Sequence, residues 1–353
     1  MSDPDPSAPT RLYVGSYTAV SGGHGVGITV LERSRADGRW QAGQVVEADD
    51  PSFLVVTEGA LHAVAETNEG RVLSYTIAAG RLVEAGVAAS GGASPCHIAH
   101  DPASNALLVA NYVGGTFGVL SSEATDPARV TATVALPSGS GPVADRQGGP
   151  HAHQVVATPW GTHLVSDLGT DRLIEVAVDV VTLEPSIVAV HPMPAGSGPR
   201  HLAWLGDDLL VVGELDARLY VVRRQGDELV IPYSVAVVEG EPNERGDLPS
   251  HLAVHGSRVY VATRGRDTIS VLETSVDAEG GSDGGESSRL RLVGQVPCGG
   301  DWPRHFAIAD GLLYCANQGS DTVSVLPLDE TTGLPGAPVD LFTLGSPACI
   351  VAV

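Results

Sequence analysis

Lysine is absent from the 353-residue sequence, and all 20 basic residues are arginine. The absence of lysine excludes Schiff-base chemistry and the lysine-dependent phosphate loop of P-loop nucleotide hydrolases. Any site for an anion must therefore be built from arginine, backbone amides or helix ends. Asp and Glu together number 42, which gives a formal net charge of −22. A surface of this sign argues against nucleic acid as a partner.

Cysteine is scarce, and long apolar runs are missing. No run of 18 apolar residues exists, so we expect no membrane-spanning helix. Residues 1–10 lack the basic start and apolar core of a signal peptide, so we expect a cytoplasmic protein with a disordered tail there. The cysteines form no CxxC pair, which favours reduced, buried thiols without a disulfide, metal or other cofactor. They are Cys96, Cys298, Cys315 and Cys349.

A repeated unit organises the rest of the chain, which we expect to form one domain over residues 11–353. Gly (43) and Pro (24) are plentiful, which favours short strands and tight turns. The unit begins with Pro-x-His or a relative and continues with apolar strands at spacings of 44 to 55 residues, typical of a propeller blade. Its leading prolines are Pro51, Pro95, Pro150, Pro199, Pro249, Pro303 and Pro347.

The two ends of the chain complete the seventh unit. Residues 347–353 have the pattern of a first strand, whereas residues 12–15 and 27–31 have that of second and third strands. Pairing them would close a ring and remove exposed sheet edges. The sequence therefore predicts an all-β, seven-bladed β-propeller of four-stranded antiparallel blades, in which N- and C-terminal strands share one blade. The acidic, low-complexity residues 275–289 are expected to form an outer loop.

Candidate site residues follow from the geometry of a blade. The start of the first strand and the end of the second lie on one rim, so residues there encircle one mouth of the channel. A residue shared by most blades indicates a structural role, here hydrogen bonds to the backbone. We expect the ring to be too wide for more than two of the shared histidines to reach one metal ion. These histidines are His97, His153, His201, His251 and His305.

Residues that belong to one blade alone are candidates for function. The segment 139–154 adds a second histidine, His151, behind a Gly-rich loop that carries Arg146 and Gln147. Arginines at a channel mouth suit a carboxylate or phosphate, although inter-blade salt bridges could explain any single one. The other candidates at this rim are Arg200, Arg264, Arg304, Glu66, Glu214, Asn111, Asn317 and Gln318.

These residues resemble the seven-bladed propeller lactonases of the 6-phosphogluconolactonase type, which are related to fungal carboxy-cis,cis-muconate lactonizing enzymes. The resemblance implies hydrolysis of a sugar-acid lactone such as 6-phosphogluconolactone to 6-phosphogluconate, a step of the pentose phosphate pathway. It assigns catalysis to His151, Arg200, Glu214 and Arg264. Thr263 and Gly213 depart from the family's usual asparagines. The matching stretches are residues 13–18, 94–97, 109–112, 139–153, 167–171, 198–203 and 303–318.

Lactone hydrolysis needs a base for the attacking water and positive charge for the oxyanion. We expect His151 to be the base, because histidine ordinarily has a pKa of about 6.5. Glu214 would orient it, or act as base if its pKa is raised. Arg200 and Arg264 would stabilise the oxyanion. The expected substrate contacts are Arg146, Gln147, Arg304, Asn111, Asn317, Gln318, Glu66 and His153.

Two other functions stay open at this point. One is a lactonizing cycloisomerase that acts on a dicarboxylate of the muconate type. The other is a non-catalytic propeller that serves as a binding platform, because a fold does not fix a function. In the enzymatic interpretation, the partner is a small anionic lactone and the protein is a monomer or a weak homo-oligomer.

Overall fold

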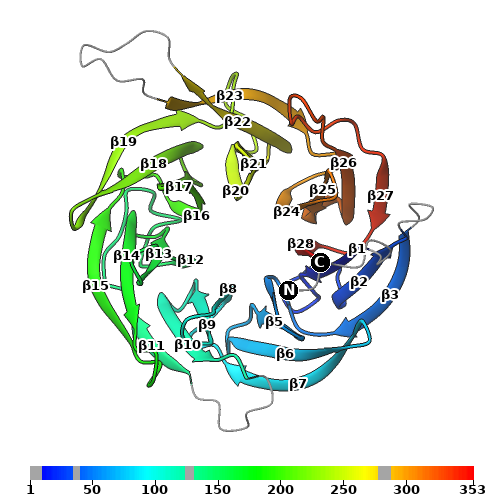
Figure 1. Ribbon diagram of the computed structural model, residues 1–353, viewed down its shortest axis with the longest axis horizontal. Coiled ribbons are helices and arrows are strands. Elements are labelled where there is room, and N and C mark those ends of the chain that lie inside the picture. Colours follow the sequence, from blue (N-terminus) through cyan, green and yellow to red (C-terminus); the bar gives the residue numbers. More distant parts are fainter. Residues whose placement is uncertain (1–9, 35–39, 124–130, 277–287) are drawn as a thin grey trace.

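A computed structural model describes residues 10–34, 40–123, 131–276 and 288–353. Seven antiparallel sheets of four strands each surround a central channel (Figure 1). This arrangement confirms the predicted seven-bladed propeller. Within the described residues, the one helical element is the short 3₁₀ helix η1 (Gln318–Ser320), and no helix could span a bilayer. The predicted tail (except Thr10) and residues 277–287 of the predicted outer loop lie outside the described residues.

The strands are best described from the channel outward. The innermost strands are β4 (Leu54–Thr57), β8 (Pro95–Asp101), β12 (Ala152–Ala157), β16 (Pro199–Leu205), β20 (Leu248–His255), β24 (Pro303–Ala309) and β28 (Pro347–Ala352). The second strands are β5 (Ala60–Ala65), β9 (Ala106–Asn111), β13 (His163–Asp167), β17 (Asp208–Gly213), β21 (Arg258–Arg264), β25 (Leu312–Asn317) and β1 (Thr10–Ser16).

The two outer strands complete each blade. The third strands are β6 (Arg71–Ala78), β10 (Thr116–Ser121), β14 (Arg172–Val178), β18 (Arg218–Gln225), β22 (Thr268–Val276), β26 (Thr322–Pro327) and β2 (Gly27–Arg33). The outermost strands are β7 (Arg81–Ala89), β11 (Ala132–Ala135), β15 (Pro185–Pro192), β19 (Glu228–Ala236), β23 (Ser288–Pro297), β27 (Asp340–Thr343) and β3 (Trp40–Glu47).

The last blade closes the ring as the sequence predicts. β28 pairs with β1 in antiparallel register, with Val14 opposite Ile350. Apolar side chains between neighbouring blades form the core, and Leu12 and Val14 pack here against Tyr314 of β25. The N- and C-terminal strands therefore belong to one sheet, and their mutual pairing leaves neither as a free inner edge.

A β-bulge follows the leading proline in several innermost strands, with register shifts in β8, β12, β16, β20 and β24. In β24, Pro303 pairs with Asn317 and His305 pairs with Ala316, so Arg304 has no partner across the ladder. A bulge breaks the alternation of side chains along a strand and re-aims one of them. As a result, Arg304 and His305 are consecutive and yet both line the channel.

The shared histidines contact one another in the channel, which corrects the expectation that they bind the backbone. His201 Nδ1 and His251 Nδ1 lie 2.9 Å apart, and the rings of His251 and His305 stack with centroids 3.8 Å apart. His97 packs against Phe53, which replaces histidine in the preceding blade, at 4.4 Å. For His305, the expectation is correct, because its Nδ1 accepts a hydrogen bond from a backbone amide of β28 at 3.3 Å.

This histidine cluster makes folding sensitive to acid. Burial lowers the pKa of all five histidines, to about 3 for His97 and His305. Their pKa in the unfolded chain is about 6.5, so folding favours the neutral form. The stability that they contribute is complete above about pH 6.5 and is lost as the pH falls. We predict a steep fall in Tm between about pH 6.5 and 5, with roughly five protons taken up on unfolding.

The matched variant for this prediction is His97→Phe, which copies the residue of the preceding blade. It should reduce the proton uptake on unfolding by about one, measured from the pH dependence of the unfolding free energy. The exposed His255 is the control, and His255→Gln should leave the profile as it is. A Tm that stays constant from pH 7 to 5 would contradict the assignment.

Candidate active site

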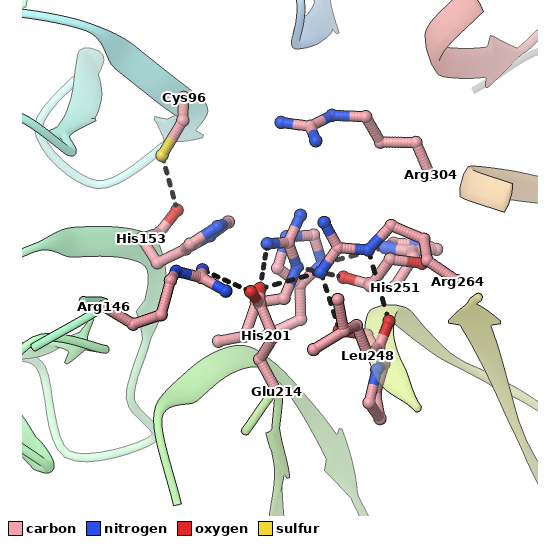
Figure 2. A network of polar contacts seen from close by, with 12 residues as sticks. Cys96, Arg146, His153, His201, Glu214, Leu248, His251, Arg264 and Arg304 are labelled. Carbon is pink, nitrogen blue, oxygen red and sulfur yellow. Dashed lines mark hydrogen bonds and ion pairs between the residues drawn. The ribbon is translucent and has the colours of Figure 1, made fainter. Parts of the chain in front are cut away.

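A buried ion cluster occupies one mouth of the channel (Figure 2). The carboxylate of Glu214, just after β17, is fully buried and accepts hydrogen bonds from Arg146 through one oxygen and Arg200 through the other. Arg264 lies 2.9 Å from that second oxygen. Arg200 comes from the bulge of β16, Arg264 from the end of β21, and Arg146 from the loop before β12. The structure thus brings together four of the predicted site residues.

The charges in this cluster stabilise one another. Burial raises the pKa of Glu214, but the guanidinium groups of Arg264, Arg200 and Arg146 outweigh it and hold that pKa well below its usual range. Burial in turn lowers the pKa of Arg264 to about 9. Glu214 is therefore a permanent carboxylate. The expectation that a raised pKa could make it the base is wrong, and its hydrogen bonds orient arginines rather than His151.

His151 lies beside this cluster, and one of its ring nitrogens is engaged in a hydrogen bond. Its Nδ1 lies 3.0 Å from the carbonyl oxygen of Tyr112, and a carbonyl only accepts, so the proton is on Nδ1 and Nε2 carries the lone pair. The ring stacks on that of Tyr112 at 4.4 Å, with an interplanar angle of 9°. Gly169 is required for this fit, because a Cβ there would come within 2.8 Å of His151 Cδ2.

Tyr112 connects His151 to the arginines, because its hydroxyl group lies beside Arg146. The backbone N–H of His151 donates to Asp167 at 2.7 Å, which anchors the segment after the Gly-rich loop. His151 is half-buried, and its ring lies on that of Tyr112, whose hydroxyl group lies beside Arg146. The side chain thus has the tautomer and the position of a general base.

His153 differs from His151 in its environment. Its side chain is buried, and its Nδ1 has no hydrogen-bond partner among the residues that the structure describes. Figure 2 shows its ring beside the arginine cluster. Burial and, next to it, the charge of Arg200 lower its pKa well below the ordinary value. The imidazole therefore remains neutral, and its weak basicity makes His153 a poorer proton acceptor than an ordinary histidine.

A second group lies across the mouth and includes one residue that sequence reasoning missed. The Tyr17 hydroxyl donates to Glu66 Oε2 at 2.7 Å and accepts a hydrogen bond from Arg304. The Arg304 guanidinium also lies over the Tyr17 ring, 4.7 Å from its centroid. In the sequence, Tyr17 directly follows the rim position at the end of β1, and this placement could have identified it as a site residue. At the mouth, four guanidinium groups thus face two carboxylates.

Three predicted substrate contacts belong instead to the framework. Gln147 is fully buried, and its Nε2 donates to Leu168 O and to Asp171 Oδ1 at 2.9 and 2.8 Å, so it holds the loop that presents Arg146. The fully buried amides of Asn111 and Asn317 donate to Thr116 Oγ1 and Ser324 Oγ of their own blades. The structure corrects these three assignments. Gln318 begins η1, and its buried Oε1 has no hydrogen-bond partner in the described part of the chain.

The described residues contain no group of three or more His, Cys, Asp or Glu side chains placed to hold a metal ion. The five channel histidines are not such a group, although neighbouring rings contact one another. All four cysteines are buried free thiols, as the sequence predicts. The polar groups that could act on a substrate are therefore the arginines, the carboxylates and the histidines.

Comparison with known proteins gives a consistent result. The family model described as "Lactonase, 7-bladed beta-propeller" matches residues 11–352. A 6-phosphogluconolactonase of Bacillus subtilis is 26% identical over 96% of this chain and 97% of its own length. The solved structure of a Pseudomonas aeruginosa periplasmic gluconolactonase is similar with a TM-score of 0.83 and 26% identity, over 98% of this chain and 99% of that one. The chain therefore belongs to the seven-bladed β-propeller lactonases, which are carboxylic ester hydrolases that open lactone rings.

Proposed function

We propose that this lactonase hydrolyses a sugar-acid lactone, with 6-phosphogluconolactone as its substrate and 6-phosphogluconate as the product. The names of its relatives from Bacillus subtilis and Formosa agariphila support this substrate. The observation that carries the proposal is the excess of guanidinium groups over carboxylates beside His151. Such a mouth attracts an anionic lactone even though the protein as a whole is acidic.

The reaction begins with a water molecule that His151 activates. Nε2 takes a proton from the water while its oxygen attacks the ring carbonyl, and the carbonyl π electrons move onto the oxygen. When this tetrahedral oxyanion collapses, the bond between the carbonyl carbon and the ring oxygen breaks. The imidazolium returns the proton to the ring oxygen, which leaves a hydroxyl group and a carboxylic acid that ionises. The hydrogen bond from Nδ1 to the Tyr112 carbonyl holds the imidazole in one orientation throughout.

Arg200 and Arg264 supply positive charge for the oxyanion. Both side chains are more than nine-tenths buried and fixed by hydrogen bonds, Arg200 Nε to Ser250 O at 2.7 Å and Arg264 Nε to Leu248 O at 3.2 Å. Donors that are fixed before the reaction need no reorganisation when charge develops. Glu214 keeps these donors in place and does not act as a base.

A muconate-type cycloisomerase is the second candidate, because a dicarboxylate would also match the excess of arginine. The two reactions run in opposite directions, so assays of lactone hydrolysis and of muconate cyclisation separate them. We expect hydrolysis of freshly prepared 6-phosphogluconolactone above its spontaneous rate and no cyclisation. Cyclisation without lactone hydrolysis would contradict the proposal.

The first variant tests the base. His151→Gln should lower kcat by about 10²- to 10⁴-fold on 6-phosphogluconolactone, because the water loses its proton acceptor. Proton release at constant pH measures the rate, and the exposed His255→Gln is the matched control. If His151→Gln and His151→Ala both keep kcat/KM within about threefold of the wild type on every lactone, His151 is not the base.

The second variant tests the role of the buried carboxylate. Glu214→Gln leaves three guanidinium groups without their counter-ion, so unfolding free energy should fall by about 3–5 kcal/mol. The matched control is Glu32→Gln, which breaks the partly exposed ion pair with Arg11 and should cost about 1 kcal/mol or less. Urea denaturation measures both. If Glu214→Gln and Glu32→Gln lower the unfolding free energy equally, the charges of the Glu214 cluster do not stabilise one another.

A further inference from the structure

Arg304 is the guanidinium at the mouth that no carboxylate neutralises by direct contact. Figure 2 shows it apart from Arg146 and Arg264, which lie beside Glu214. The three arginines around Glu214 all pair with its carboxylate, whereas Arg304 has no carboxylate oxygen within ion-pair distance in the part of the chain that the structure describes. Its hydrogen-bond partner is the neutral hydroxyl of Tyr17. Its positive charge is therefore available to a ligand.

Tyr17 fixes Arg304 without neutralising it. The hydroxyl proton is committed to Glu66, at 2.7 Å, so the Tyr17 oxygen accepts from Arg304. The Arg304 guanidinium packs over the face of the Tyr17 ring, with 4.7 Å between Arg304 Cζ and the ring centroid. A fixed cation that lacks a counter-ion is costly to desolvate, and an anionic ligand that makes charge-assisted hydrogen bonds offsets that cost.

Ser52 provides a second unengaged donor at the same place. Its side chain is 4% exposed, and its Oγ has no hydrogen-bond partner in the described structure. Ser52, Arg304 and Arg200 line one depression of about 10 Å³, which has room for a single water molecule. A buried hydroxyl without a partner is unfavourable unless something binds it. A water molecule in this space can satisfy Ser52, whereas the half-buried Arg304 is the donor that an anionic ligand can reach.

We propose that Arg304 binds an oxyanion group, a carboxylate or a phosphate ester, that the lactone carries at the end remote from its ring carbonyl. This inference rests on the proposed lactonase function, in which the carbonyl reacts at Arg200, Arg264 and His151. Arg304 then determines specificity for charged lactones, and Tyr17 is a positioning residue that acts through it.

The experiment compares lactones that differ in charge. Wild type, Arg304→Gln, Arg304→Lys and Tyr17→Phe are assayed on 6-phosphogluconolactone, on a glucarolactone that carries a free carboxylate, and on uncharged gluconolactone. Loss of one charge-assisted hydrogen bond corresponds to about a 10- to 100-fold change. We expect Arg304→Gln to reduce the kcat/KM ratio of charged to uncharged lactone by that factor, mainly through KM. Tyr17→Phe should reduce it less, and Arg304→Lys should restore part of it.

The control is Arg223→Gln, which breaks an exposed ion pair with Asp208 at the opposite rim and should leave the ratio as in the wild type. If Arg304→Gln lowers kcat/KM by equal factors on charged and uncharged lactones, the inference is wrong although the lactonase function stands. The inference is also wrong, and the lactonase function again stands, if Arg304→Gln changes kcat/KM on neither the charged nor the uncharged lactones. A larger effect on the phosphorylated lactone identifies a phosphate as the group bound, and a larger effect on glucarolactone identifies a carboxylate.

Calorimetric titration with inorganic phosphate tests the subsite independently of turnover. Wild type should bind phosphate about tenfold or more tightly than Arg304→Gln, at equal Tm of the two proteins. Equal affinities contradict the inference. If the wild type hydrolyses no lactone and yet shows this difference, the proposed function fails whereas the anion subsite stands.

Discussion

The carboxylate of Glu214 and the guanidinium groups around it are the interaction on which the site depends. Each of these ions alone would be costly to bury, and together they lower each other's free energy enough to remain charged. The cluster combines residues from different blades, so it exists only when the ring is assembled. Because a single carboxylate faces three guanidinium groups, the cluster retains positive charge. This excess of positive charge can stabilise an oxyanion.

The fold supplies this geometry through two devices. Bulges in the innermost strands turn consecutive side chains into the channel, which is how Arg200 and His201 can both face it. Hydrogen bonds between blades then fix the start of two innermost strands, from Ser166 Oγ to Arg200 O and from Ser250 Oγ to Pro303 O, each at 2.6 Å. The Gly-rich loop is held by Gln147 and delivers Arg146. Rigid scaffolding of this kind is what preorganised catalysis requires.

Much of this structure could be predicted from the sequence. The spacing of the leading prolines gave seven blades, and the unpaired patterns at the two ends gave the closing blade, because both depend on local periodicity. The convergence of Arg200, Glu214 and Arg264 followed from their rim positions, and that of Arg146 from the Gly-rich loop before His151. Bulges and side-chain directions have no such periodic signal. For that reason the buried amides of Asn111 and Asn317 were taken for substrate contacts, Tyr17 was missed, and the histidines were assigned to the backbone.

The central claim is that a lactone reacts at this one mouth, with its carbonyl at the Glu214 cluster and its charged end at Arg304. A crystal structure of the protein with 6-phosphogluconate tests it most directly. We predict that the product carboxylate lies within hydrogen-bond distance of Arg200 and Arg264, near His151 Nε2, and that the phosphate contacts Arg304. Product bound at the opposite end of the channel, or with its carboxylate away from both arginines, would contradict the account.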